Sequence, residues 1–330
     1  MGSSLEELFG SISISSFSVL FYVFIAAWSL NVYVTYFLKS TKGSQSLSYH
    51  YHLDTRTQNL WGVEIPNFLD VITNLIFVLV GGAGVIACIL CLPGKTSLSD
   101  NEKSGWYIFF IGFTFVSIGS AYYHWTPNNW TLVWDRLPMT IGFMSLFYIA
   151  QKAYGEVQSV SLLGNLLLGI FSMVIWFVSL FFNQGVCLDL NSEGYRSIVD
   201  ARQSGEPLHV NIMGNRDGSG LDRWTAKEVL TKANIMVYDQ LLPYVIVQFY
   251  PIVALCYMIF TWPSSAELSL WYLLPTFILY ILAKVLEAAD LKSEYLFKSV
   301  CQDHISGHSL KHLSAGLAAI SLIVFIINVD

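Results

Sequence analysis

Long hydrophobic runs alternate with polar segments along the whole chain. A membrane-spanning helix needs about 20 predominantly apolar residues. Runs of roughly this length or longer cover residues 16–38, 68–92, 106–124, 132–150, 160–182, 241–262, 268–289 and 305–329. We therefore predict an all-α polytopic membrane protein with eight spanning helices. The polar segments are short except for residues 39–64 and 183–239.

Composition agrees with this prediction. Hydrophobic residues make up 54% of the 330 residues and charged residues only 12%, whereas soluble domains carry about 25% charged residues. The net charge of −6 and the lack of a long basic run give no reason to expect nucleic acid as a partner. Cys88 and Cys91 lie inside an apolar run, which favours a packing role over a redox or metal site.

A first group of polar side chains lies where one hydrophobic run ends and the next begins. Ser120 and His124 are four residues apart, so they share one face of a helix, one turn apart. Asp135 follows a short loop and opens the next run. The chain reverses here, so we expect Asp135 to return to the level of His124.

A second group lies at the start of the last run. His308 and His312 are again one turn apart on one helical face. Each hydrophobic crossing reverses the direction of the chain, so the start of the last run can lie on the same side of the membrane as His124. We therefore predict that the two groups meet.

Three converging histidines favour a metal site. Zinc prefers imidazole nitrogen, and a catalytic zinc keeps three protein ligands and one open position for water. His124, His308 and His312 supply that number, and bound zinc lowers the pKa of its water. Asp135 could then act as the general base and acid, and Ser120 could donate a hydrogen bond to an oxyanion.

Each of these residues also has a structural interpretation. His308 and His312 could face lipid headgroups, and Asp135 could pair with Arg136 or Lys311. Ser120 could bond back to a helix carbonyl, as serine often does within helices. The functional interpretation depends on finding all of these residues together. Polar groups within membrane spans are energetically costly, and several of them occur here at one level.

The same residues resemble a known family. The patterns that carry the resemblance are Gly119-Ser120-x-x-x-His124, then after ten residues Asp135-x-Leu137-Pro138-Met139, and finally His308-x-x-x-His312-x-x-Ser314-Ala315-Gly316. They are similar to those of the alkaline ceramidases, which belong to a wider group of seven-helix membrane hydrolases that includes the adiponectin and progestin receptor relatives. The resemblance extends from about Asn67 to the end of the chain and includes Asn74 and Asp290.

The resemblance implies a fold, an activity and a location. It implies a seven-helix hydrolase core at residues 65–330 with a long insertion at 183–239, preceded at 1–64 by an added amino-terminal helix and a polar linker. It implies a zinc amidase site at Ser120, His124, Asp135, His308 and His312, a ceramide or phytoceramide substrate, and the endoplasmic reticulum or the Golgi. The sequence does not identify a protein partner.

Two observations argue against calcium dependence. The family's calcium-binding stretch has the form Trp-x-Glu-x-Asn with a following Glu, whereas this chain has Trp61, Glu64 and Asn67 at different spacing. The segment 215–220 imitates the start of an EF-hand loop, but Ala226 stands where the bidentate Glu is needed.

We therefore expect a zinc-dependent intramembrane amidase that cleaves ceramide-type lipids into a sphingoid base and a fatty acid. Two alternatives stay open. The first is a seven-helix lipid receptor or sensor in which zinc has a structural role. The second is a hydrolase of another lipid amide or ester.

Overall fold

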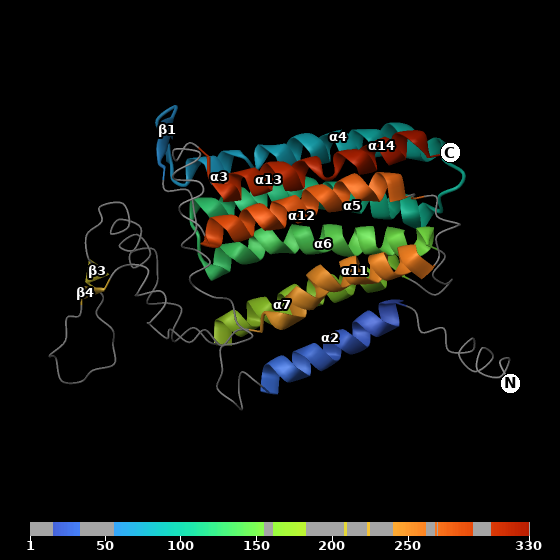
Figure 1. Ribbon diagram of the computed structural model, residues 1–330, viewed down its shortest axis with the longest axis horizontal. Helices are drawn as coiled ribbons and strands as arrows, with labels where there is room; N and C mark the ends of the chain where they lie inside the picture. Colours follow the sequence, from blue (N-terminus) through green and yellow to red (C-terminus); the bar gives the residue numbers. More distant parts are fainter. Residues whose placement is uncertain are drawn as a thin grey trace.

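The computed structural model describes residues 16–33, 56–154, 161–182, 208–209, 223–224, 240–261, 268, 270–292 and 305–329. Most of these residues form long helices that lie roughly side by side (Figure 1). The helices are α2 (Ser16–Val32), α3 (Phe68–Ile72), α4 (Leu75–Cys91), the 3-10 helix η3 (Leu92–Gly94), α5 (Asp100–Trp125), α6 (Asn129–Ala153), α7 (Leu162–Phe182), α11 (Leu242–Thr261), α12 (Leu270–Lys292), α13 (Gly307–Leu317) and α14 (Ile320–Asn328). The strands are β1 (Gln58–Leu60), β2 (Val63–Ile65), β3 (Leu208–His209) and β4 (Arg223–Trp224), paired β1 with β2 and β3 with β4, both antiparallel.

The helix order in space differs from the order in sequence. Helix α5 packs against α4 and α6, and α6 in turn contacts α7 and α11. The carboxyl-terminal helices complete the bundle on the other side of α4. There α14 contacts α4, and α12 contacts both α13 and α14. Helix α2 packs against α11 at the edge of the bundle (Figure 1). The two ends of the helical core are therefore adjacent, which brings α13 beside α3 and α4.

Six of the described helical segments are long and apolar enough to cross a membrane. They are Phe68–Gly94, Asp100–Trp125, Leu162–Leu180, Leu242–Ile259, Trp271–Asp290 and Gly307–Asn328. These segments confirm the predicted all-α polytopic membrane fold and make the chain a multi-pass membrane protein. The predicted number of eight spans is not confirmed, because the runs 16–38 and 132–150 are not among the six.

The run 132–150 differs from the others for a physical reason. It lies within α6, which carries Asp135 and Arg136 in its first half and Gln151 and Lys152 near its end. Helices α5, α7 and α11 all contact α6, and its Arg136 and Gln151 side chains are buried inside the bundle. The run 16–38 is described only to residue 33, and within it Val19–Val32 forms a shorter apolar helix.

One end of the bundle holds the β1–β2 hairpin, α3 and the start of α13 (Figure 1). The hairpin turn places Trp61 and Gly62 at positive φ values of 51° and 85°, as expected for a two-residue connection. The predicted boundary between residues 64 and 65 falls inside β2. The division into two domains stays a prediction. Most of the insertion 183–239, including residues 215–220, lies outside the described residues.

Candidate metal centre and lipid cavity

The structure brings His124, His308 and His312 together. His124 lies in the last turn of α5, and the other two lie in the first half of α13. The Nε2 atoms of His124 and His308 are 3.2 Å apart, and the three ring centroids are separated by 4.7, 4.9 and 4.9 Å. All three side chains are buried, with 1%, 5% and 2% of their surface exposed.

This donor set fits a metal ion. The candidate ligand nitrogens all lie within 4.8 Å of one another. Around a tetrahedral zinc with Zn–N distances of about 2.0–2.1 Å, neighbouring nitrogens are about 3.3 Å apart, close to the separation between His124 and His308. Among the described residues, no other group of three or more His, Cys, Asp or Glu has such an arrangement.

Thr73 orients His312. The Thr73 hydroxyl donates to the Leu69 carbonyl oxygen at 2.7 Å, and the same oxygen lies 2.9 Å from Nδ1 of His312. Since the hydroxyl proton is already used, Nδ1–H of His312 is the donor in the second hydrogen bond. The Nε2 lone pair is then available on the other side of the ring. Such a hydrogen bond fixes both the tautomer and the ring orientation of a metal ligand.

A polar network fixes the start of α13. The Ser306 side chain caps the helix by accepting from the Ser309 amide at 2.9 Å, and Asp290 accepts from the Gly307 amide at 2.9 Å. The hydroxyls of Ser306 and Ser309 both donate to the fully buried Asp70, at 2.9 and 2.8 Å. Helix α13 is thereby tied to α3 and to the end of α12, which sets the position of His308.

Asn67 fixes the end of α5. Its side-chain amide donates to the His124 carbonyl oxygen at 2.7 Å. That carbonyl is one of the last in the helix, where no intrahelical donor follows. Asn67 itself has a left-handed backbone conformation with φ 48°, directly before α3. Asn67 therefore connects α3 to the candidate metal ligand His124.

Ser120 and Asp135 face each other across the contact between α5 and α6. The Ser120 hydroxyl lies close enough to the Asp135 carboxylate to interact with it. Gly119 permits this approach, because a Cβ atom there would overlap with the Trp134 carbonyl oxygen. Pro138 has no N–H to bond this carbonyl within α6. The Gly-Ser and Leu-Pro motifs of the sequence thus meet at one close backbone contact.

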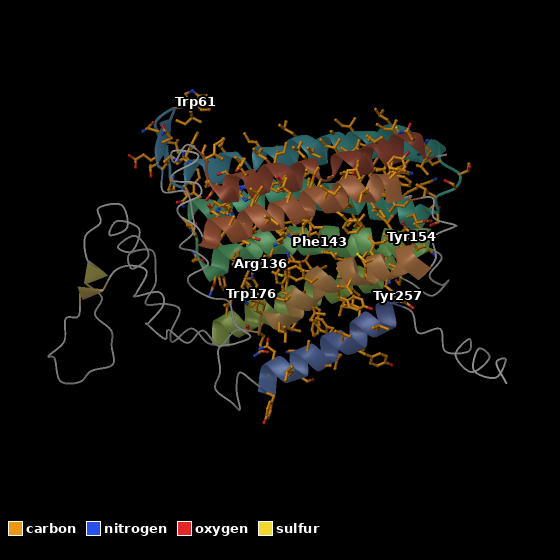
Figure 2. All side chains as sticks on the ribbon, in the orientation of Figure 1. Trp61, Arg136, Phe143, Tyr154, Trp176 and Tyr257 are labelled. Carbon is orange, nitrogen blue, oxygen red and sulfur yellow. The ribbon has the colours of Figure 1, made fainter. Side chains whose placement is uncertain are left out.

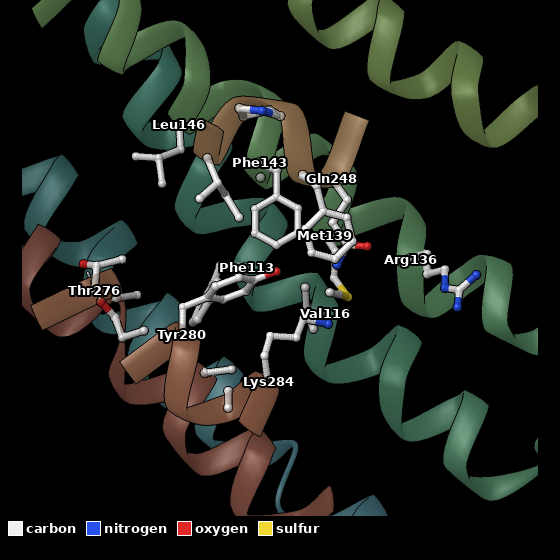
Figure 3. Close-up of a pocket in the computed structure, with 18 of the residues that line it drawn as sticks. Phe113, Val116, Arg136, Met139, Phe143, Leu146, Gln248, Thr276, Tyr280 and Lys284 are labelled. Carbon is white, nitrogen blue, oxygen red and sulfur yellow. Dashed lines mark hydrogen bonds between the residues drawn. The ribbon is translucent and has the colours of Figure 1, made fainter. Parts of the chain in front are cut away.

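A cavity of about 370 Å³ adjoins this group, and Ser120, Asp135 and His312 contribute to its wall. Most of the remaining wall is apolar and comes from α5, α6, α11, α12 and α14. Figure 3 shows Phe113, Phe143 and Tyr280 gathered around it. Its size falls within the range of small-molecule pockets, and its lining suits hydrocarbon chains.

Charged side chains also lie in the cavity wall. The Glu287 carboxylate binds Lys284 at 2.9 Å and Lys311 at 3.2 Å. The sequence showed the Lys284–Glu287 spacing of one helical turn, but that spacing alone did not indicate a role near the histidines. Arg136 lies with its guanidinium 4.8 Å from the ring centroids of both Trp176 and Tyr244. Figure 2 labels Arg136 and Trp176 in this region.

Fold and site together define a polytopic α-helical membrane protein with a buried histidine cluster beside an apolar cavity. The family model described as Ceramidase matches residues 61–191. This match confirms the predicted resemblance to the ceramidases over these residues. The matched region includes Ser120, His124 and Asp135 but ends before His308 and His312. No curated protein and no solved structure matched the chain.

Proposed function

We propose that this protein is a zinc-dependent amidase of the membrane interior that hydrolyses ceramide-type lipids to a sphingoid base and a free fatty acid. One observation carries the proposal: in a chain with a ceramidase-family region, three buried histidines from α5 and α13 converge beside a largely apolar cavity. The family match supports lipid amide hydrolysis, and the cavity supports a hydrophobic substrate.

His124, His308 and His312 would hold the zinc ion. When bound, zinc supplies a Lewis acid and makes a water molecule easier to deprotonate. The Asp135 carboxylate, on the cavity wall, accepts the proton of the attacking water and later delivers it to the leaving nitrogen. The Ser120 hydroxyl, which lies beside Asp135, donates a hydrogen bond to the oxygen of the tetrahedral intermediate.

The cavity explains why the substrate is a lipid. Its aromatic and aliphatic wall contacts acyl chains, and Ser120, Asp135 and His312 in the same wall mark the place for the amide. The surrounding spans allow the substrate to enter from the bilayer. The family resemblance supplies ceramide or phytoceramide as the particular lipid. It also supplies the endoplasmic reticulum or the Golgi as the compartment.

Metal content and amide hydrolysis of the same purified protein test the proposal. The full chain in detergent should contain about one zinc per chain and release fatty acid from ceramide or phytoceramide. His124→Ala should lose both zinc and activity. His209→Ala, which changes a histidine in β3 far along the chain from the cluster, is the matched control and should lose neither.

Other outcomes separate the alternatives. Bound zinc without turnover of any lipid amide or ester would favour a receptor or sensor with a structural metal. Turnover of another amide or ester, but not of ceramides, would keep the site and change the substrate. A wild-type protein that binds no zinc would refute the proposal.

A further inference from the structure

An ion-pair cluster on α12 and α13 reaches the histidines. Lys311 Nζ lies 3.2 Å from Oε1 of Glu287 and 2.8 Å from Nε2 of His308. Oε2 of Glu287 binds Lys284 at 2.9 Å. The side chains of Lys311 and Glu287 are only 18% and 12% exposed. We define Lys284, Glu287 and Lys311 as the lysine–glutamate cluster.

The cluster belongs to the cavity. All three members contribute to the cavity wall, and Figure 3 shows Lys284 extending from α12 toward Val116 on α5. Asp135 and Arg136 are the other charged residues of that wall. An acyl chain gains nothing from ionised groups in the wall of its cavity, and keeping such groups out of water has a free-energy cost. The cluster therefore needs an explanation beyond acyl-chain binding.

Lys311 and a metal ion compete for the same atom. Nε2 of His308 is the nitrogen that faces Nε2 of His124, and it has a single lone pair. When that lone pair ligates a metal ion, it no longer accepts a hydrogen bond from Lys311. The ammonium group carries three N–H donors, and Glu287 continues to hold one of them. The N–H group of Lys311 that bonded His308 can then donate to an oxygen atom of a ligand beside the histidines.

We propose that Lys311 is a catalytic residue that binds the oxygen of the reacting carbonyl, and that the same contact holds the carboxylate of the released fatty acid. Glu287 is its positioning residue, because it fixes the flexible lysine side chain against α12. This inference rests on the proposed function for the location of the substrate amide. The lysine–glutamate cluster thus forms a subsite for the acidic end of a long-chain lipid.

The chemistry of the step is amide hydrolysis, and Lys311 is unchanged at its end. The water oxygen forms a bond to the carbonyl carbon, and the carbonyl oxygen gains negative charge near the Lys311 ammonium. The carbon–nitrogen bond then breaks, and Asp135 passes the proton it took from the water to the leaving nitrogen. The remaining proton of the acid moves to the free amine, so the products are a carboxylate and an ammonium group. A cation placed where negative charge develops stabilises the transition state more than the neutral substrate.

Binding of an acid and an alcohol of equal chain length tests the subsite without turnover. Oleate and oleyl alcohol are titrated against the purified full chain in neutral detergent, and the zinc content of every variant is measured. Lys311→Met should weaken oleate binding about tenfold or more, while binding of oleyl alcohol and zinc content stay unchanged. Lys311→Arg keeps a positive charge and should retain most of the oleate affinity.

A matched control is Lys152→Met, which changes a lysine of α6 outside the cavity wall and should affect neither ligand. If Lys311→Met does not fold, Lys311→Gln removes the charge with a polar side chain. Equal changes in the affinities for oleate and alcohol would overturn the inference, as would a loss of oleate binding in Lys284→Met but not in the Lys311 variants. Selective oleate binding that depends on Lys311, in a protein that hydrolyses no ceramide, would keep the subsite and refute the proposed function.

Discussion

Individual polar residues around the histidine cluster determine what the cluster can bind. Thr73 illustrates this, since its hydroxyl contacts Nδ1 of His312 and so leaves Nε2 available as the ligand nitrogen. Asp70 has a comparable role at the start of α13, where it accepts two hydroxyl groups. Neither residue would touch the metal ion, yet both limit the freedom of its ligands.

Thr73→Val should therefore lower zinc affinity. Valine keeps the shape of threonine but removes the acceptor for Nδ1–H of His312, so the ring can rotate and change tautomer. Loss of such an outer partner typically costs about 10- to 100-fold in metal affinity. Competition with a chromogenic zinc chelator measures the change. Thr73→Ser keeps the hydroxyl and should bind zinc as the wild type does; equal zinc affinity in the valine variant would contradict the assigned role.

Asp135→Asn should separate catalysis from metal binding. The amide has nearly the shape of the carboxylate but cannot accept a proton, so fatty acid release should fall by about 10²- to 10⁴-fold. Zinc content should stay unchanged, because the three histidines remain. Fatty acid release and metal content are measured on one preparation. Asp100→Asn, at the exposed start of α5, is the matched control, and undiminished release in the Asp135 variant would assign the base to another group.

At the level of helices, close contacts at glycine residues set the site. Gly119 on α5 lies against the Trp134 carbonyl of α6, and Gly316 on α13 lies against Ile76 of α4. Each glycine stands four residues or fewer from a candidate site residue. The distance between the helices near the site therefore depends on these two glycines, which have no side chain, as much as on the side chains around them.

Gly119→Ala should destabilise the protein and disturb the contact between Ser120 and Asp135. The added methyl group would meet backbone rather than a movable side chain, and such overpacking costs typically about 1–3 kcal/mol. Gly82→Ala, in α4, is the matched control because no atom lies within 4 Å of the position that its added methyl group would take. Thermal unfolding should show a lower midpoint only for Gly119→Ala, and equal midpoints for the two variants would contradict the role of this contact.

The helical spacing in the sequence predicted the histidine cluster but not the break between α3 and α4. One-turn spacing and chain reversal were enough to predict that His124, His308 and His312 meet. The run 68–92, however, hides a break at Thr73 and Asn74 that separates α3 from α4, because both sides of the break are apolar. Thr73 and Asp70 acquire their partners through this break, from residues more than 200 positions away, and no local pattern records such contacts.

For the whole molecule, the histidine cluster joins two distant parts of the chain. His124 and His308 are 184 positions apart, and they connect α5 with α13. The ceramidase-family match covers only the first of these two parts. The candidate site therefore depends on the complete helical bundle, in which α14, the last helix, packs against α4.

Zinc should stabilise the whole bundle, because the ion binds three histidines that come together only in the folded chain. A ligand present at about 100 times its dissociation constant adds about 2.7 kcal/mol to the free energy of unfolding. The unfolding midpoint of the full chain in detergent should therefore rise with added zinc and fall after treatment with a chelator. His124→Ala should respond much less to either treatment, since two histidines on α13 alone no longer connect it to α5. His209→Ala should respond as the wild type does. If zinc shifted the midpoint of His124→Ala by the full amount, the ion would bind elsewhere, and the three histidines would not be its site.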